Sequence, residues 1–173
     1  MRDTEFKRVL KTMQPGTGVM LDGPYGSFTL HNKATTPAVF LTGGIGVTPV
    51  RSILLQAIHA QVPHRILVFY ATRRPEDAAF LDDLSAAHAA NPNYTFVGTM
   101  VEMEKSSREW HGETGFINKT MLLKFIDDLT LPIFYLDGPA PMVKAMRDML
   151  SVAGEHPYGR VFRLLITTVL GAY

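Results

Sequence analysis

The sequence predicts an α/β fold in which a parallel β-sheet is covered by helices on both faces. From residue 37 onward, short apolar segments of strand length alternate with segments of helical periodicity. The apolar segments are continuous and do not alternate with polar residues, as expected for strands that are buried on both faces. A glycine-rich turn follows the first apolar segment directly, at the point where a strand passes into a helix.

Each element after residue 37 is predicted from its apolar pattern. Strands are predicted at residues 37–42, 66–70, 94–101 and 133–136, and an apolar segment at 164–170 is typical of a further buried strand. Helices are predicted at residues 49–58, at 75–84 with an apolar stripe of Ala79, Phe80 and Leu84, at 121–129 and at 142–150.

The N-terminal region follows a different pattern. A short amphipathic helix is predicted from four apolar residues at helical spacing, Phe6, Val9, Leu10 and Met13. A short strand is expected at residues 19–21, and a Gly-Pro-Tyr-Gly turn follows it at 23–26. Small polar residues at 31–36 separate the two patterns, so we divide the chain into units 1–36 and 37–173.

Composition and charge exclude several classes of function. The formal net charge is +1, which gives no bulk attraction for nucleic acid. The chain has no cysteine, so it contains no disulfide, thiolate nucleophile or cysteine-ligated metal centre of its own. The six histidines lack metal-ligand spacing, and no metal site is expected. The charged N-terminus does not resemble a signal peptide and no apolar run spans a bilayer, so we expect a cytoplasmic protein.

The most informative motif is Thr-Gly-Gly-Ile-Gly-Val-Thr-Pro at residues 42–49. Glycine has no β-carbon, so the backbone can turn tightly and approach a pyrophosphate closely. Thr48 is predicted as the N-cap and Pro49 as the first helical residue. The N–H groups at the positive end of that helix then favour an anion. The alternative is a glycine turn that only packs a strand against a helix, since the GxGxxG pattern is absent.

Several segments, in the same order along the chain, resemble ferredoxin–NADP reductase-like flavoproteins. GGIGVTP after PAVFLT is similar to the nucleotide domain of that family, and LDGPYGSFTL is similar to the end of its flavin-binding barrel. FYATRRPEDAAFLDDL resembles its second strand and following helix, and WHGETGFI resembles a loop of bacterial members. FYLDGPAPMVKAMRDML resembles its GP-x-x-M turn. The order of these motifs makes the resemblance more specific than any one of them.

The resemblance implies a Rossmann-like domain that binds NADP or NAD, preceded by a fragment of the antiparallel β-barrel that binds FAD. Hydride transfer then runs directly between nicotinamide and flavin, so no side chain needs to act as an acid or a base. The residues that match cofactor-binding positions are Gly43, Gly44, Ile45, Gly46, Val47, Thr48, Pro49, Thr72, Arg73, Arg74, Asp137, Gly138, Pro139 and Met142 for the nucleotide, and Thr4 and Tyr173 for the flavin.

Arg73 and Arg74 follow the second predicted strand, where the adenosine ribose lies in that family. Two guanidinium groups suit a 2′-phosphate, which predicts a modest preference for NADPH. The alternative is that both arginines pair with Glu76 and Asp77 at a solvated helix start. If NADH binds more tightly, one of these carboxylates is the better candidate for the ribose contact.

Three departures from the family pattern bear on function. No Arg-x-Tyr-Ser/Thr flavin motif is present, so this chain alone is expected to hold FAD weakly or not at all. Asp137 stands where many members have a cysteine, and it either favours the cationic, oxidised nicotinamide or caps the following helix. The C-terminal segment is longer and more apolar than is usual, which leaves open whether Tyr173 stacks on the flavin.

Together these features predict an NAD(P)H-dependent flavin oxidoreductase that exchanges a hydride between nicotinamide and FAD. The alternative is a non-catalytic nucleotide-binding subunit, or a truncated product that has lost its flavin domain. The expected partner is an electron-transfer protein or a small acceptor, and a homodimer that covers the barrel edge is a further expectation.

Overall fold

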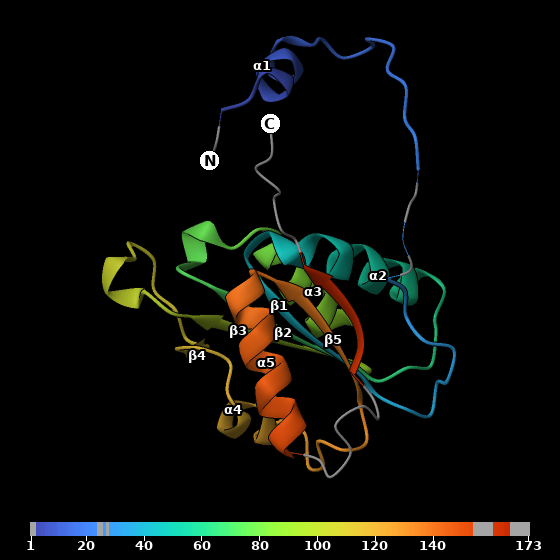
Figure 1. The fold of residues 1–173 in the computed structure, drawn as a ribbon, viewed down its shortest axis with the longest axis vertical. Helices are drawn as coiled ribbons and strands as arrows, with labels where there is room; N and C mark the ends of the chain where they lie inside the picture. Colours follow the sequence, from blue (N-terminus) through green and yellow to red (C-terminus); the bar gives the residue numbers. More distant parts are fainter. Residues whose placement is uncertain (1–2, 24–25, 27, 154–160, 167–173) are drawn as a thin grey trace.

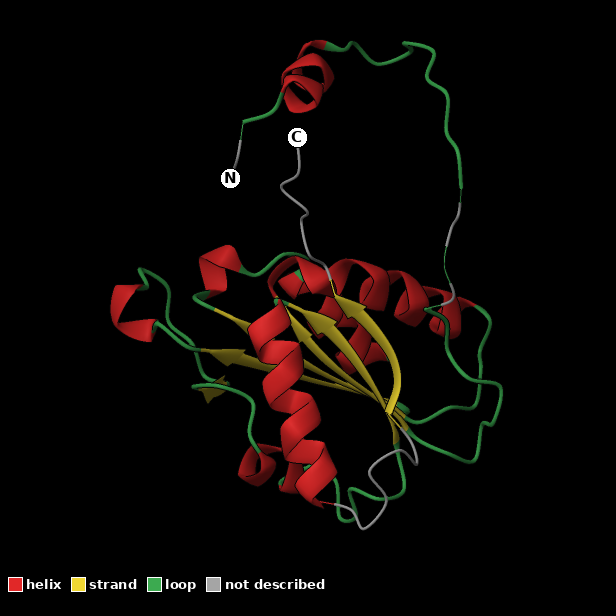
Figure 2. Cartoon of the chain, viewed as in Figure 1, coloured by secondary structure: helices red, strands yellow, loops and turns green. Residues whose placement is uncertain are grey.

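In a computed structural model, the described residues form one six-stranded parallel sheet that lies between two layers of helices (Figures 1 and 2). The structure describes residues 3–23, 26, 28–153 and 161–166. The strand order is β4-β3-β2-β1-β5-β6. The predicted α/β fold, Rossmann-like with helices on both faces of a parallel sheet, is confirmed.

The elements have the following bounds. The strands are β1 (Ala38–Gly43), β2 (Ile66–Thr72), β3 (Tyr94–Met100), β4 (Glu113–Thr114), β5 (Ile133–Gly138) and β6 (Val161–Ile166). The helices are α1 (Glu5–Thr12), α2 (Val47–His59), α3 (Leu81–Ala90), α4 (Lys119–Leu123) and α5 (Ala140–Ala153). Single turns of 3-10 helix form at η1 (Gly44–Gly46), η2 (Pro75–Asp77) and η3 (Met103–Lys105).

The central strands are predominantly apolar because each face of the sheet meets its own core. Every residue of β1 is buried. Its Leu41 belongs to the core under α4 and α5, whereas the adjacent Phe40 belongs to the core under α2. Successive side chains of a strand point to opposite faces, so a strand in the middle of three layers has no polar side. This burial on both faces explains the continuous apolar pattern of the sequence.

Three predicted elements differ from the structure. Residues 19–21 form no strand and are exposed, because no neighbouring strand pairs with them among the described residues. The helix predicted from Pro75 is interrupted at Phe80, whose φ of 59° places it in the left-handed region. The helix predicted at 121–129 ends at Leu123. Beyond that end, the Asp128 carboxylate accepts the backbone N–H of Thr130 and favours a local turn over a helix.

The sheet has a topological switch point between β1 and β5. The chain leaves β1 into α2, which covers one face, and leaves β5 into α5, which covers the other (Figure 2). The two connections diverge at the carboxyl ends of these strands and leave a crevice there. Ligands of open α/β sheets bind in such crevices, so a binding site is expected at this edge of the sheet.

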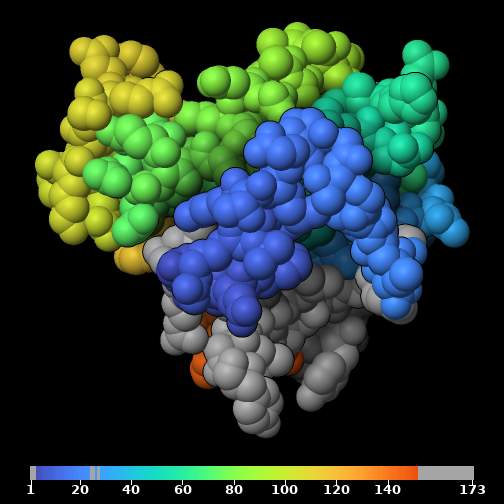
Figure 3. Space-filling view, turned by 90° about the horizontal axis from the view of Figure 1, so that it is seen from above, coloured from blue at the N-terminus to red at the C-terminus, as the bar shows by residue number. Residues whose placement is uncertain are grey.

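The N-terminal residues stand apart from the sheet. Helix α1 forms as predicted, but none of its residues is buried, and Phe6 is 71% exposed. In Figure 3 this blue segment lies in front of the body of the molecule. The described part of residues 1–36 contains α1 and no strand. The division into a barrel remnant and a nucleotide-binding domain stays a prediction.

Candidate nucleotide site

Two glycines in the turn after β1 have different structural roles. Gly44 has a φ of +54°, and a β-carbon added to it would meet no protein atom within 4 Å, so its open side faces outward. A β-carbon added to Gly46 would lie 2.6 Å from the carbonyl oxygen of Asp137 on β5. Gly46 therefore lets α2 approach β5, whereas Gly44 exposes bare backbone on the side where a ligand can approach.

Helix α2 begins earlier than the sequence predicts. Its first residue is Val47 and its N-cap is Gly46, because the 3-10 turn η1 continues directly into the helix. Thr48 is therefore inside the first turn, and its Oγ1 donates to the carbonyl oxygen of Ile45 at 2.9 Å. Pro49 is the third helical residue, a position whose N–H has no helical acceptor in any case. The positive end of α2 still faces the glycine turn, as an anion site requires.

The turn after β5 closes the other side of the crevice. Gly138 ends β5 opposite Gly43, and a β-carbon added to Gly138 would lie 3.1 Å from the backbone nitrogen of Gly43. The same added atom would lie 3.1 Å from Sδ of Met142 on α5. The two glycine-containing turns are thus packed backbone to backbone at the switch point. Larger residues would separate the strands at this edge.

A cavity of about 640 Å³ opens at this edge on the α5 side of the sheet. Six of the predicted cofactor-binding residues line it, namely Gly43, Gly44, Thr72, Arg73, Pro139 and Met142. Eight more residues complete the lining, namely Ala71, Asp77, Val101, Phe116, Ile117, Pro141, Ala145 and Met146. The other predicted nucleotide contacts do not border the cavity, and they are Ile45, Gly46, Val47, Thr48, Pro49, Arg74, Asp137 and Gly138.

Sequence reasoning missed the far wall of the cavity. Phe116, which is 76% exposed, and Ile117 follow the short strand β4. Both residues belong to the WHGETGFI segment, which resembles a family loop in the sequence but to which no role was assigned. Met146 fits helical spacing as a core residue, and it is indeed 7% exposed while its side chain also borders the cavity. A residue can serve both as core and as lining, and periodicity alone does not separate the two.

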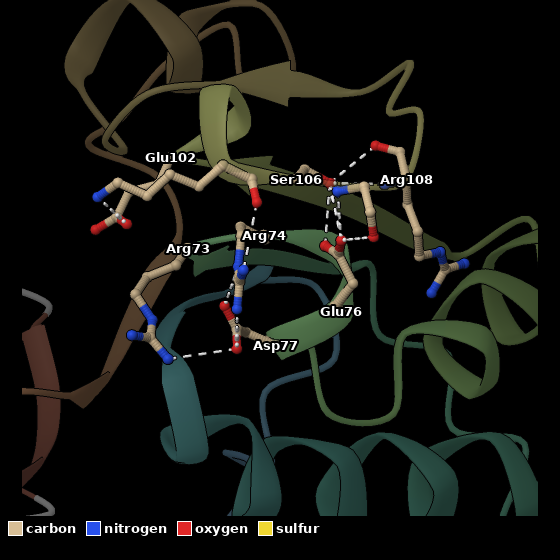
Figure 4. Close-up of polar contacts among 9 residues, drawn as sticks. Arg73, Arg74, Glu76, Asp77, Glu102, Ser106 and Arg108 are labelled. Carbon is tan, nitrogen blue, oxygen red and sulfur yellow. Dashed lines mark hydrogen bonds and ion pairs between the residues drawn. The ribbon is translucent and has the colours of Figure 1, made fainter.

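A cluster of charged side chains lies at the end of β2 (Figure 4). The Asp77 carboxylate accepts from Nε of Arg74 at 2.9 Å and from NH2 of Arg73 at 3.3 Å. The hydrogen bond from Arg74 lowers the pKa of Asp77, and the charge of Arg73 lowers it further. Arg74 also donates to the carbonyl oxygen of Lys105, whereas the Arg73 side chain is 64% exposed and borders the cavity. The two arginines therefore differ in how far they are committed to protein partners.

Glu76 faces away from the cavity and holds the loop that contains η3. Its carboxylate accepts from the backbone N–H and the hydroxyl of Ser107, both at 2.7 Å, and from the hydroxyl of Ser106 (Figure 4). These hydrogen bonds, led by the Ser107 hydroxyl, lower the pKa of Glu76 to about 2. Glu76 is thus occupied by the loop, and of the two acidic residues only Asp77 borders the cavity.

The remaining predicted residues have separate environments. Asp137 is 1% exposed at the carboxyl end of β5, in register with Thr42 of β1. Thr4, predicted as a flavin contact, is the N-cap of α1, and its Oγ1 accepts the backbone N–H of Lys7 at 3.3 Å. Tyr173 lies outside the described residues.

Within residues 3–23, 26, 28–153 and 161–166, no three histidine or acidic side chains are grouped so that they could hold a metal ion. In the same part of the chain, no helix has the length and apolar character needed to cross a membrane.

The sequence of this chain is similar to those of known proteins. The family model described as the oxidoreductase NAD-binding domain matches residues 40–148. One subunit of the Na(+)-translocating NADH-quinone reductase of Actinobacillus succinogenes is 28% identical over 152 residues, which are 84% of this chain and 36% of that protein. The same subunit from Yersinia pestis (strain Pestoides F) is 28% identical over 149 residues, again covering 36% of its length. This chain therefore spans about a third of the curated relatives that it matches.

Solved structures share the fold. The cytochrome b5 reductase domain of Ulva prolifera nitrate reductase superimposes with a TM-score of 0.74 at 22% identity, covering 88% of this chain and 63% of that one. A ferredoxin NADP+ reductase from Neisseria gonorrhoeae with bound FAD and NADP gives a TM-score of 0.69 at 22% identity, covering 89% and 64% of the two chains. At this identity the likeness concerns the fold alone.

Proposed function

The chain belongs to the oxidoreductase NAD-binding domain family, and on this basis we propose that it binds NAD(P)H at the switch point and presents the nicotinamide to a flavin. The observation that carries the proposal is the open side of Gly44 in front of the N-terminal end of α2. A side chain would fill the space that a pyrophosphate needs, and the helix end favours its negative charge. A bound nicotinamide nucleotide supplies a hydride, and the protein supplies the position.

The cavity has a polar side and an apolar side, which fit different parts of a dinucleotide. Arg73 and Asp77 border the side next to β2 and suit the hydroxyl or phosphate groups of the adenosine ribose. Pro139 and Met142 border the side next to β5 and suit the nicotinamide ring. Phe116 offers an exposed aromatic ring to the planar groups. The pyrophosphate then lies across the glycine turn between the two sides.

The choice between NADPH and NADH depends on Arg73 in this proposal. Arg74 is held by Asp77 and by the Lys105 carbonyl, so its guanidinium stabilises the charged cluster at the end of β2. Among the described residues, the Arg73 guanidinium has one ion pair, to Asp77 at 3.3 Å, so it can turn toward a 2′-phosphate. We therefore keep a modest preference for NADPH and assign it to Arg73. Asp77 is the residue that would bind the ribose if NADH is preferred.

Flavin binding is proposed to depend on groups outside this chain. Thr4 is engaged as a helix cap, and the described part of residues 1–36 forms no strand that could belong to a barrel. Met20 and Leu21 are 98% and 92% exposed, which is unusual for large apolar side chains and suits an interface. We propose that this chain alone holds FAD weakly or not at all. A non-catalytic nucleotide-binding subunit, or a truncated product, remains the second candidate for the isolated chain.

The acceptor is an electron-transfer protein or a small molecule, a homodimer covers the exposed N-terminal residues in the isolated chain, and the protein is cytoplasmic. Asp137 does not border the cavity, and we propose that it acts from behind the nicotinamide end, where a carboxylate would favour the cationic, oxidised ring. No nucleic-acid partner is proposed, because the net charge is only +1.

Calorimetric titration with NADH and NADPH tests nucleotide binding, with Gly44→Ala as the informative variant. Its added methyl group projects into the ligand space, so binding should fall below detection while the circular dichroism spectrum is retained. Gly16→Ala is the matched control, because Gly16 also has a positive φ and open space around it but lies far along the chain in the N-terminal segment. Equal affinity in the Gly44→Ala variant and the wild type would contradict the proposed site.

Flavin absorbance after gel filtration tests the second half of the proposal. The isolated chain is expected to elute without stoichiometric flavin and to oxidise NADPH negligibly. A yellow protein that turns over NADPH on its own would restore the interpretation as a complete flavin enzyme. Nucleotide binding without flavin would be compatible with two interpretations: a domain of a larger flavin enzyme, or a non-catalytic binding subunit. Adding a flavin-containing partner would distinguish them.

A further inference from the structure

Phe80 has a backbone conformation that its own sequence neighbourhood does not favour. It is the N-cap of α3, yet its φ of 59° and ψ of 22° place it in the left-handed region, which bulky residues rarely adopt. An N-cap residue is ordinarily extended, and its side chain accepts a backbone N–H, which phenylalanine cannot do. Backbone strain of this kind persists only where the surrounding structure enforces it, and it is concentrated at functional sites.

The residues before Phe80 favour a continuous helix. Pro75 suits a first helical position, the acidic residues after it suit the first turn, and the two alanines that follow have the highest helix propensity. With Phe80 in the right-handed region, a single helix from Pro75 to Ala90 would satisfy these preferences. The structure instead has η2 as a separate turn before Phe80 and α3 after it. Contacts with other elements must therefore impose the break.

Arg51 of α2 holds the break from the neighbouring helix. Its guanidinium carbon lies 4.7 Å from the centroid of the Phe80 ring, which is a cation–π contact. The same guanidinium donates from Nε at 2.8 Å and from NH2 at 2.6 Å to Oδ2 of Asp83, in the first turn of α3. One cation thus fixes both the ring of the break residue and the helix that begins after it.

Tyr70 of β2 holds the chain on the other side of the break. Its side chain is fully buried, and its Oη accepts the backbone N–H of Ala79 at 3.1 Å. In a continuous helix this N–H would donate to the Pro75 carbonyl, four residues earlier, so the bond to Tyr70 belongs to the broken form. Two different elements, α2 and β2, therefore select the same local conformation.

The break determines where the charged cluster at the end of β2 lies. Asp77 ends η2, three residues before Phe80, and it borders the nucleotide cavity while it pairs with Arg73 and Arg74 (Figure 4). In a continuous helix, η2 would follow the axis of α3, and Asp77 would leave its place beside the two arginines. The position of the cluster thus depends on α2, which covers the face of the sheet opposite to the cavity.

We propose that Arg51 is a positioning residue for nucleotide selectivity: by holding Phe80 in the left-handed conformation, it keeps η2 and the charged side chains of residues 73–77 at the cavity. This inference rests on the proposed function, because selectivity presupposes that the cavity binds a nicotinamide nucleotide. Arg51 does not border the cavity and makes no contact with the nucleotide. Its effect on selectivity is transmitted through Arg73, which distinguishes it from a residue that only stabilises the fold.

Backbone chemical shifts of the full chain without nucleotide test the first step. In Arg51→Met, which keeps an unbranched apolar stem, the Cα shifts of residues 76–80 should move to helical values because the break is no longer held. Arg65→Met is the matched control, since Arg65 is exposed directly before β2, at the opposite edge of the sheet, and it should leave these shifts unchanged. Unchanged shifts in Arg51→Met would overturn the proposal.

Two variants at position 80 separate the ring from the backbone conformation. Glycine adopts the left-handed region without strain, whereas alanine favours a helix. Phe80→Gly should therefore keep the shifts of residues 76–79 and the wild-type ratio of NADPH to NADH affinity, and Phe80→Ala should behave as Arg51→Met does. Neither variant has the ring, so equal behaviour of the two would show that the backbone conformation does not position the cluster.

Calorimetric titration with NADPH and NADH tests the second step. Arg51→Met should lower the ratio of NADPH to NADH affinity about tenfold, as Arg73→Ala should, because the 2′-phosphate loses the same charge-assisted contact. Adding Arg51→Met to Arg73→Ala should lower the ratio no further, since the two residues act through one contact. A general loss of stability would instead weaken both nucleotides equally.

An unchanged ratio in Arg51→Met, or a double variant whose effects add, would overturn the inference. A wild-type chain that binds neither nucleotide would overturn the proposed function instead. In that case the chemical shifts of Arg51→Met and of the two position-80 variants would still decide whether Arg51 holds the break.

Discussion

The turn after β1 and the turn after β2 lie at the same edge of the sheet but offer a ligand different things. The first presents backbone, with Gly44 open to solvent and the end of α2 behind it. The second presents side chains, with Arg73, Arg74 and Asp77 joined by ion pairs. Backbone groups bind any pyrophosphate in the same way, whereas charged side chains distinguish one nucleotide from another. In the proposed site, affinity and specificity therefore reside on separate connections.

The largest expected effect comes from the first turn and concerns stability. Gly46→Ala places a methyl group against the Asp137 carbonyl oxygen, and neither backbone can move without separating α2 from β5. We expect the free energy of unfolding to fall by about 1–3 kcal/mol, measured by urea denaturation. Gly44→Ala should cost about 1 kcal/mol from its φ alone, so the two neighbours separate a packing role from a binding role. A Gly46→Ala variant as stable as the wild type would remove this distinction.

The next effect concerns the second turn and changes specificity. Arg73→Ala should weaken NADPH binding about tenfold and leave NADH binding unchanged, because a charge-assisted contact with the 2′-phosphate is lost. Arg74→Ala should leave the ratio of the two affinities as it is, since Arg74 is held by Asp77 and the Lys105 carbonyl. Calorimetric titration of both variants with both nucleotides gives the four dissociation constants. If Arg73→Ala weakens both nucleotides equally, the 2′-phosphate assignment is wrong.

The smallest expected effect concerns Glu76, which lies behind the second turn, and this effect disappears in acid. The pKa of Glu76 is about 2 in the folded protein, against an ordinary value of 4.5, so its stabilising contribution is complete above pH 4.5. The contribution is lost as the pH falls from 4.5 through 2. Glu76→Gln should therefore lower the protection of amides in residues 106–108 at pH 6 and make it less dependent on acid than in the wild type. Identical acid profiles would show that the Glu76 carboxylate does not hold this loop.

Local patterns in the sequence determined the arrangement of the domain. Continuous apolar segments such as β1 and β2 predicted strands buried on both faces, because only a central layer excludes polar side chains from both sides. The glycine turn was identified because only glycine allows a tight strand-to-helix connection with close backbone approach. Gly43, Gly44 and Met142, identified from the motifs, do line one cavity.

Only the tertiary structure decided the features that depend on partners distant in the sequence. Residues 19–21 have the composition of a strand but no neighbour to pair with in the described chain, and Phe80 breaks a helix that periodicity extends through it. The different fates of Arg73 and Arg74 follow from the position of the Lys105 carbonyl, which is 31 residues away from Arg74. His31 and Tyr135 meet across 104 residues of chain. A sequence pattern reports which face of an element is buried, but it does not report which distant group will lie opposite.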